Sequence, residues 1–161
     1  MASALKSLSQ YNADEIPSGK GLRIGIVVSE YNADITFKLL NGCIDTLVQH
    51  GVKDNHLYIT YVPGAFELTY GARIVAKQQK VDAIICLGCV IKGDTDHDKY
   101  INHAVAQGIT NLSLHIDLPV IFGLLTPNTL EQAVDRAGGK HGNKGVEAAV
   151  TALKMAALNN R

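Results

Sequence analysis

The sequence predicts an α/β protein with three layers, in which a four-stranded parallel sheet with flavodoxin-like winding is covered by helices on both faces. Four short apolar stretches alternate with longer stretches of helical periodicity, and this alternation is typical of parallel sheets with right-handed crossovers. The apolar stretches are nearly continuous, as expected for strands buried on both faces. The expected strands are residues 22–28, 57–62, 83–87 and 120–125.

Each strand is followed by an expected helix. The first helix should end at Gly51, because glycine suits the position just after a helix. The Pro63-Gly64 pair separates the second strand from the second helix. The remaining expected elements follow in order: a helix at about 66–79, one beginning near His97, a short one at 129–137, a glycine-rich loop at 138–145 and a final helix.

Composition excludes several classes of function. The chain has 161 residues, with 15 basic and 15 acidic side chains, so no excess of charge favours nucleic acid or an anionic membrane as a partner. No apolar run approaches the roughly 20 residues of a membrane helix, and the first residues do not resemble a signal peptide. We expect a cytoplasmic protein with an arm at 1–20 outside the core and one catalytic α/β domain at 21–161.

The cysteines raise the alternative of a metal or redox site. Cys86 and Cys89 form a C-x-x-C pattern with His97 and His103 nearby in sequence. A redox pair of this kind sits at the start of a helix, whereas Cys86 falls inside an expected strand. A structural zinc site usually needs a second ligand pair, which the sequence lacks. We therefore predict that Cys86, Cys89 and Cys43 are free thiols and that no metal is bound.

The segment after the third strand is the strongest candidate for a functional site. The loops that follow parallel strands meet at one edge of the sheet, where ligands bind. Gly88 and Gly93 shape this loop, Asp94 and Thr95 follow, and His97 stands at the expected start of a helix. Backbone N–H groups and a hydroxyl can bind an anion, and an imidazole can transfer protons. The dinucleotide and Walker patterns are both missing.

Each candidate site residue, in this segment and after or within the other strands, also has a purely structural interpretation. His97 could be a solvated residue of a first helical turn, and Asp94 or Asp96 an ordinary helix cap. Tyr31 could be a half-buried loop residue and Phe122 a core residue. No single position decides between the two interpretations.

Four motifs in one order resemble the lumazine synthase family of riboflavin biosynthesis. They are VPGAFE at 62–67, LG-x-VI-x-G-x-T-x-H at 87–97, VIFGLLT at 120–126, and RAG followed by GNKG within 136–145. The resemblance extends over about residues 22–158. It implies condensation of 5-amino-6-(D-ribitylamino)uracil with 3,4-dihydroxy-2-butanone 4-phosphate to 6,7-dimethyl-8-ribityllumazine, with release of phosphate and water and with no cofactor.

The resemblance also implies roles for individual residues. His97 would transfer protons, and Lys144 and Glu147 would be accessory residues. Phe122 and Arg136 would reach the site from a neighbouring subunit. The pyrimidine and its ribityl chain would contact Tyr31, Asn32, Ala65, Phe66, Glu67, Cys89, Val90, Ile91 and Phe122. The phosphate substrate would contact Gly93, Asp94, Thr95 and Arg136.

Three residues depart from the family pattern. Tyr31 stands where phenylalanine or tryptophan is usual, and Asp98 replaces an aromatic residue that commonly follows the histidine. Asp94 adds a negative charge beside the expected phosphate position. The last two departures are expected to affect the strength of phosphate binding, not its location.

The resemblance implies small-molecule substrates and self-association. We expect pentamers, and a hollow shell of sixty chains, because the glycine-rich loop at 138–145 is too short to block contact between pentamers. The resemblance also implies riboflavin synthase as a possible partner protein. The alternative function is a flavodoxin-like module that binds or carries a flavin without catalysis, for which His97 would not be needed.

Overall fold

The fold is built on a four-stranded, all-parallel sheet, as the sequence predicts. The computed structural model describes residues 9–159. Their sheet has the order β2-β1-β3-β4. This order places β1 and β3 in the middle, where both are buried along their whole length. The strands are β1 (Ile24–Ser29), β2 (Leu57–Val62), β3 (Ala83–Cys89) and β4 (Val120–Leu125).

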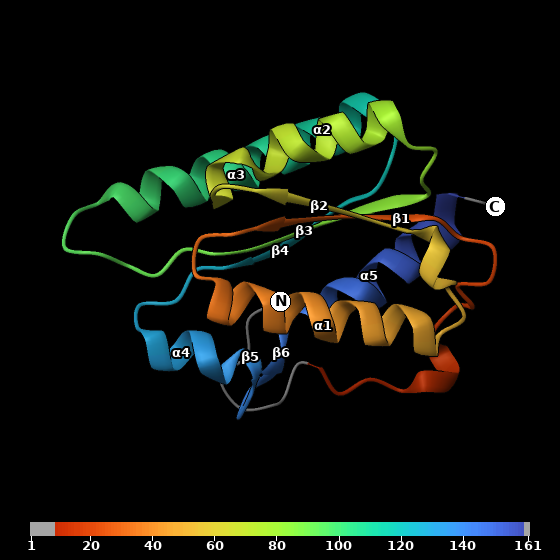
Figure 1. Ribbon diagram of the computed structural model, residues 1–161, viewed down its shortest axis with the longest axis horizontal. Coiled ribbons are helices and arrows are strands. Elements are labelled where there is room, and N and C mark those ends of the chain that lie inside the picture. The colour runs from red at the N-terminus through yellow and green to blue at the C-terminus, as the bar shows by residue number, and fades with distance from the viewer. Residues whose placement is uncertain (1–8, 160–161) are drawn as a thin grey trace.

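Helices cover both faces of the sheet, which confirms the three-layer α/β/α prediction (Figure 1). One face carries α1 (Ala33–Gln49) and α5 (Lys144–Asn159), and the other carries α2 (Leu68–Gln78) and α3 (His97–Ile116). The short α4 (Leu130–Asp135) follows β4. Within residues 9–159, no helix is long and apolar enough to cross a membrane.

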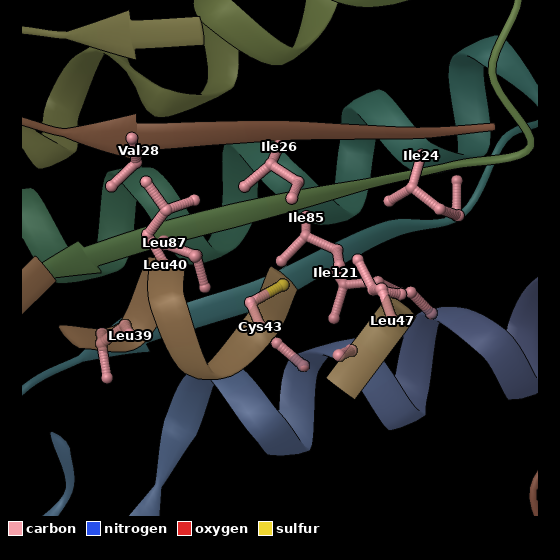
Figure 2. Close-up of a cluster of buried hydrophobic side chains, with 14 of the residues drawn as sticks. Ile24, Ile26, Val28, Leu39, Leu40, Cys43, Leu47, Ile85, Leu87 and Ile121 are labelled. Atoms are coloured by element: carbon pink, nitrogen blue, oxygen red, sulfur yellow. The ribbon is translucent and has the colours of Figure 1, made fainter. Parts of the chain in front are cut away.

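The core consists of two apolar layers, one on each face of the sheet. Side chains alternate between the faces of a strand, so Ile85 and Leu87 pack in the layer under α1 and α5, whereas Ile84 and Cys86 pack in the layer under α2 and α3. Figure 2 shows side chains of β1, β3 and β4 meeting those of α1 in the first layer. Burial on both faces explains why these strands have few polar residues.

Several predicted boundaries are wrong by a few residues. The first strand begins at Ile24, not at residue 22, and the third continues to Cys89 because that residue pairs with Leu125 of β4. The segment predicted as one helix from residue 66 opens with a separate 3₁₀ turn, η3 (Ala65–Glu67). A further 3₁₀ turn, η2 (Asp54–His56), precedes β2. The fourth helix is shorter than predicted and ends at Asp135.

The glycine-rich segment before α5 is a small hairpin, although the sequence analysis treated it as a loop. The antiparallel strands are β5 (Ala137–Gly139) and β6 (Gly142–Asn143). Gly138 and Gly142 have φ angles of 104° and 82°, which glycine adopts without strain. The hairpin leads directly into the first turn of α5.

The described part of the N-terminal arm lies against its own domain. Residues 9–20 include a 3₁₀ turn, η1 (Ala13–Glu15), and Ile16 packs against the core. The Gly19 N–H donates to the His50 carbonyl at 2.7 Å. The prediction of an arm outside the core is therefore wrong for Ile16. The sequence also allows the arm at 1–17 to add a strand to a neighbour's sheet; residues 1–8 of it lie outside the described residues, and residues 9–17 form no strand within the chain.

Gly145 gives a direct test of the contact between α1 and α5. A Cβ atom at Gly145 would overlap the carbonyl oxygen of Leu39 in α1. We expect Gly145→Ala to lower the free energy of unfolding by about 3 kcal/mol, measured by urea denaturation. In the control Gly93→Ala, the added Cβ meets no atom within 4 Å. Equal unfolding midpoints for the two variants would contradict the close packing of α5 on α1.

Candidate active site

A cavity of about 480 Å³ lies at the carboxyl edge of the sheet. Loops that follow β1, β2 and β3 meet there, as parallel topology predicts. The loop after β4 does not line the cavity, but its Pro127 carbonyl accepts a 3.0 Å hydrogen bond from the N–H of Lys92. The lining residues are Tyr31, Asn32, Gly64, Ala65, Phe66, Glu67, Cys89, Val90, Ile91, Lys92, Gly93, Thr95, His97, Asp98 and Ile101.

The loop after β1 presents an aromatic ring and is anchored by an amide. Asn32 is in the left-handed region, with φ 60°, and its Nδ2 donates to the Cys89 carbonyl at 2.9 Å. The Tyr31 N–H donates to the Pro63 carbonyl at 3.0 Å. These bonds tie three loops together, while Tyr31 itself remains 73% exposed. The ring is thus available as a stacking surface, and Asn32 mainly holds the loops.

The turn after β2 contributes η3. Ala65 is buried, whereas Phe66 and Glu67 are exposed beside the cavity. The Glu67 N–H donates to the Gly64 carbonyl at 3.3 Å, and α2 begins at the next residue. Glu67 is the last residue of this 3₁₀ turn and stands directly before α2. The turn therefore presents a carboxylate acceptor to the cavity.

The loop after β3 forms one wall through its main chain. The Val90 N–H donates to the Leu125 carbonyl at 2.9 Å, and this bond fixes the loop on the end of β4. The Cys89 carbonyl accepts from Asn32. Within residues 9–159, the Ile91 N–H makes no hydrogen bond to the chain. The Ile91 N–H is thus a main-chain donor left for a ligand.

His97 is the first residue of α3 and is exposed at the cavity. Its main-chain N–H lies 3.5 Å from Thr95 Oγ1. Asp96 stands at the N-cap position of α3, as the structural interpretation allows, but its carboxylate makes no cap bond and instead pairs with Lys99 at 2.8 Å. Asp94 is exposed and is not among the residues that line the cavity.

A second cluster forms around the start of α5. Arg136 donates from Nη1 to Glu147 Oε1 at 2.7 Å and to the His141 carbonyl at 2.8 Å. Lys144 Nζ lies 3.3 Å from the other oxygen of Glu147. All three side chains are largely buried. A guanidinium has five N–H donors, so Arg136 keeps donors beyond Nη1.

The single chain does not bring every predicted site residue together. Arg136, Lys144 and Glu147 are not among the residues that line the cavity. Phe122 lies in the edge strand β4 and is 37% exposed, also outside the cavity. Four lining residues were not among the predicted substrate contacts: Gly64, Lys92, Asp98 and Ile101. Helical spacing from His97 could have identified Ile101, since it is four residues further along α3.

The three cysteines are free and buried. Burial raises the pKa of Cys86 to about 12 and that of Cys89 to about 11, so both are protonated thiols near neutral pH. Within residues 9–159, no group of three or more His, Cys, Asp or Glu side chains has an arrangement that could hold a metal ion. These observations support the interpretation of the C-x-x-C pattern as core packing.

Comparison with known proteins decides between the candidate functions. The family model described as 6,7-dimethyl-8-ribityllumazine synthase matches residues 21–160. The chain belongs to this family. It is 56% identical over 158 residues to the 6,7-dimethyl-8-ribityllumazine synthase of Porphyromonas gingivalis, with 98% of each chain covered.

Two further relatives carry the same name. The protein of Parabacteroides distasonis is 53% identical over 155 residues, which are 96% of this chain and 97% of the relative. That of Cytophaga hutchinsonii is 53% identical over 157 residues, 98% of each chain. The family resemblance inferred from the motifs is therefore confirmed.

Proposed function

We propose that the protein condenses 5-amino-6-(D-ribitylamino)uracil with 3,4-dihydroxy-2-butanone 4-phosphate to give 6,7-dimethyl-8-ribityllumazine, phosphate and water. The observation that carries this proposal is the cavity formed by the motif-bearing loops, with His97 at its edge, in a chain that belongs to the lumazine synthase family. Family membership argues against the alternative of a flavin carrier without catalysis.

The first substrate fits the part of the cavity formed by β1, η3 and β3. The exposed Tyr31 ring offers a stacking face for the pyrimidine. The Ile91 N–H can donate to its carbonyl edge, beside Cys89 and Val90. Glu67 can accept hydrogen bonds from hydroxyls of the ribityl chain, with Ala65 and Phe66 alongside.

The second substrate carries a phosphate, which suits the loop that leads into α3. Gly93 and Thr95 line the cavity next to this helix N-terminus, where the helix dipole favours an anion. Asp94 contributes only its main-chain N–H in this proposal, because its carboxylate would repel a phosphate. His97 then lies close enough to move protons during imine formation, phosphate elimination and ring closure.

The remaining groups come from a neighbouring subunit in this proposal. Phe122 and Arg136 lie outside the cavity of their own chain, which supports a role at the cavity of another chain. Glu147 and Lys144 would hold Arg136 in position through their ion-pair network. Heterologous contacts of this kind close into rings.

The predicted assembly is a ring of five chains, with twelve rings closing into a hollow particle of sixty. The short β5–β6 hairpin supports this proposal, because it adds no long insertion between α4 and α5. Light scattering would detect the sixty-chain particle, and a uniform five-chain species at neutral pH would overturn this part of the proposal. Cytoplasmic location and association with riboflavin synthase stay predictions.

The activity is tested by mixing the purified protein with the two substrates. We expect lumazine fluorescence to rise together with release of one phosphate per lumazine formed. The control omits the protein, because the two substrates are reactive and any uncatalysed background must be subtracted. Binding of the pyrimidine without product above background would favour a binding module.

A further inference from the structure

The cavity receives one permanent positive charge from its own chain, on Lys92. Among its lining residues, all of which belong to the described part of the chain, the acids are Glu67 and Asp98. The imidazole of His97 is the other lining group that can carry a positive charge. A phosphate that enters the cavity is therefore repelled by two carboxylates, and Lys92 is the lining residue that can offset this repulsion at any pH near neutral.

Two main-chain hydrogen bonds fix the position of Lys92. The Val90 N–H donates to the Leu125 carbonyl at 2.9 Å, and the Lys92 N–H donates to the Pro127 carbonyl at 3.0 Å. Because alternate N–H groups bond to the segment after β4, the chain stays extended beyond β3 and its side chains alternate between the two faces. Val90 packs in the layer under α2 and α3, and Ile91 in the layer under α1 and α5. Lys92 therefore stands on the face of the sheet that carries α3.

The charge of Lys92 is not neutralised by the chain. The residue is exposed, and within residues 9–159 no carboxylate forms an ion pair with it. Lys99, on the first turns of α3, is paired with Asp96 at 2.8 Å and does not line the cavity. The two lysines near the start of α3 thus differ in whether their charge is available to a ligand in the cavity.

The chemistry of the two substrates decides which group Lys92 attracts. The uracil ring and the polyol chain are neutral, whereas the phosphate is an anion. Gly93 and Thr95 line the cavity directly after Lys92 and offer main-chain N–H groups and a hydroxyl to the same anion. An ammonium group on a flexible stem attracts a phosphate as a point charge and needs no fixed geometry, unlike a guanidinium. Lys92 can therefore complement Arg136 without repeating its contacts.

We propose that Lys92 is a specificity-determining residue that binds the phosphate of the second substrate through its ammonium group, beside Gly93 and Thr95. This inference rests on the proposed function, which supplies the phosphate substrate. It adds a cation from the cavity's own chain to Arg136 of the neighbouring chain. The two cations contact the phosphate from different chains and together offset the repulsion by the carboxylates of the cavity.

Calorimetric titration with inorganic phosphate, combined with steady-state kinetics, tests this role. We expect Lys92→Ala to weaken phosphate binding about fivefold at low salt and to raise KM for the phosphate substrate by a similar factor, as for an exposed charge pair. KM for the pyrimidine should change less than twofold. Salt screens exposed charges, so the difference from the wild type should fall below twofold at about 0.5 M NaCl. Lys92→Arg keeps the charge and should bind phosphate within twofold of the wild type.

Lys99→Ala is the matched control, because it removes an exposed lysine close in sequence that does not line the cavity. It should leave both measurements unchanged. Unchanged phosphate affinity of Lys92→Ala, or an equal loss in Lys99→Ala, would overturn the role of Lys92. A loss that persists at high salt, or that Lys92→Arg shares, would contradict a role of its charge. The titration needs no turnover, so a wild-type protein that makes no lumazine would instead contradict the proposed function.

Discussion

Replacing His97 with alanine is expected to lower kcat about 100-fold, the lower end of the usual contribution of general acid–base catalysis. His97 is exposed at the edge of the cavity and begins α3, and imidazole gains and loses protons near neutral pH. KM for the pyrimidine should change little, because stacking on Tyr31 and the main-chain contacts remain. Steady-state kinetics with each substrate varied in turn separates the two effects.

His103→Ala is the matched control for this prediction. His103 lies on the same helix and is exposed, but it does not line the cavity. Its removal should leave kcat within twofold of the wild type. If kcat of His97→Ala were also unchanged, His97 would be a solvated residue of the helix start, and proton transfer would have to be assigned elsewhere.

Replacing Arg136 with alanine is expected to raise KM for the phosphate substrate by roughly 10- to 100-fold, because charge-assisted hydrogen bonds to the phosphate are lost. KM for the pyrimidine should change less than threefold. Arg136→Lys should recover only part of the loss, since an ammonium cannot reproduce the fork of a guanidinium. Lys140→Ala, an exposed cation in the same hairpin region, is the control for a general effect of charge.

Loss of Arg136 also leaves Glu147 with Lys144 as its remaining cation, so folding must be checked in the same experiment. The particle size and unfolding midpoint of the variant are therefore compared with those of the wild type. An equal rise in KM for both substrates would contradict a phosphate-specific role and would point to a defect in folding or assembly.

The sheet could be predicted from sequence because its strands are buried on both faces. A buried parallel strand is nearly continuous in apolar residues, and 83–87 is so uniform that it fits no exposed element. The register between neighbouring strands, and so the residues at which they end, could not be predicted from the apolar pattern. The end of β3 at Cys89 depends on its contact with Leu125, which is 36 residues distant in sequence, and no local pattern reports that contact.

Short elements were missed for a related reason. The β5–β6 hairpin contains few residues and no alternating apolar pattern, and its glycines indicate only that a turn is possible. Ile16 was assigned to an external arm because its neighbours are polar, yet it packs on the core. In both cases tertiary contacts decide the structure.

The site could be predicted in outline, because topology brings the loops after parallel strands to one edge. Glu67 and His97 were found in this way and line one cavity. The motifs alone could not show that Arg136 is held by Glu147 outside that cavity, or that Asp98 lines it. Both depend on side-chain positions in the folded chain.

The central claim is that each site combines the cavity of one chain with Arg136 of another. It is tested most directly by unfolding His97→Ala and Arg136→Ala chains, mixing them in equal amounts and refolding them together. Random assembly places an intact cavity next to an intact Arg136 at about one interface in four, so about a quarter of the wild-type activity should return when the phosphate substrate is kept well below the wild-type KM. Well-mixed particles that stay as inactive as the separate variants would contradict a shared site.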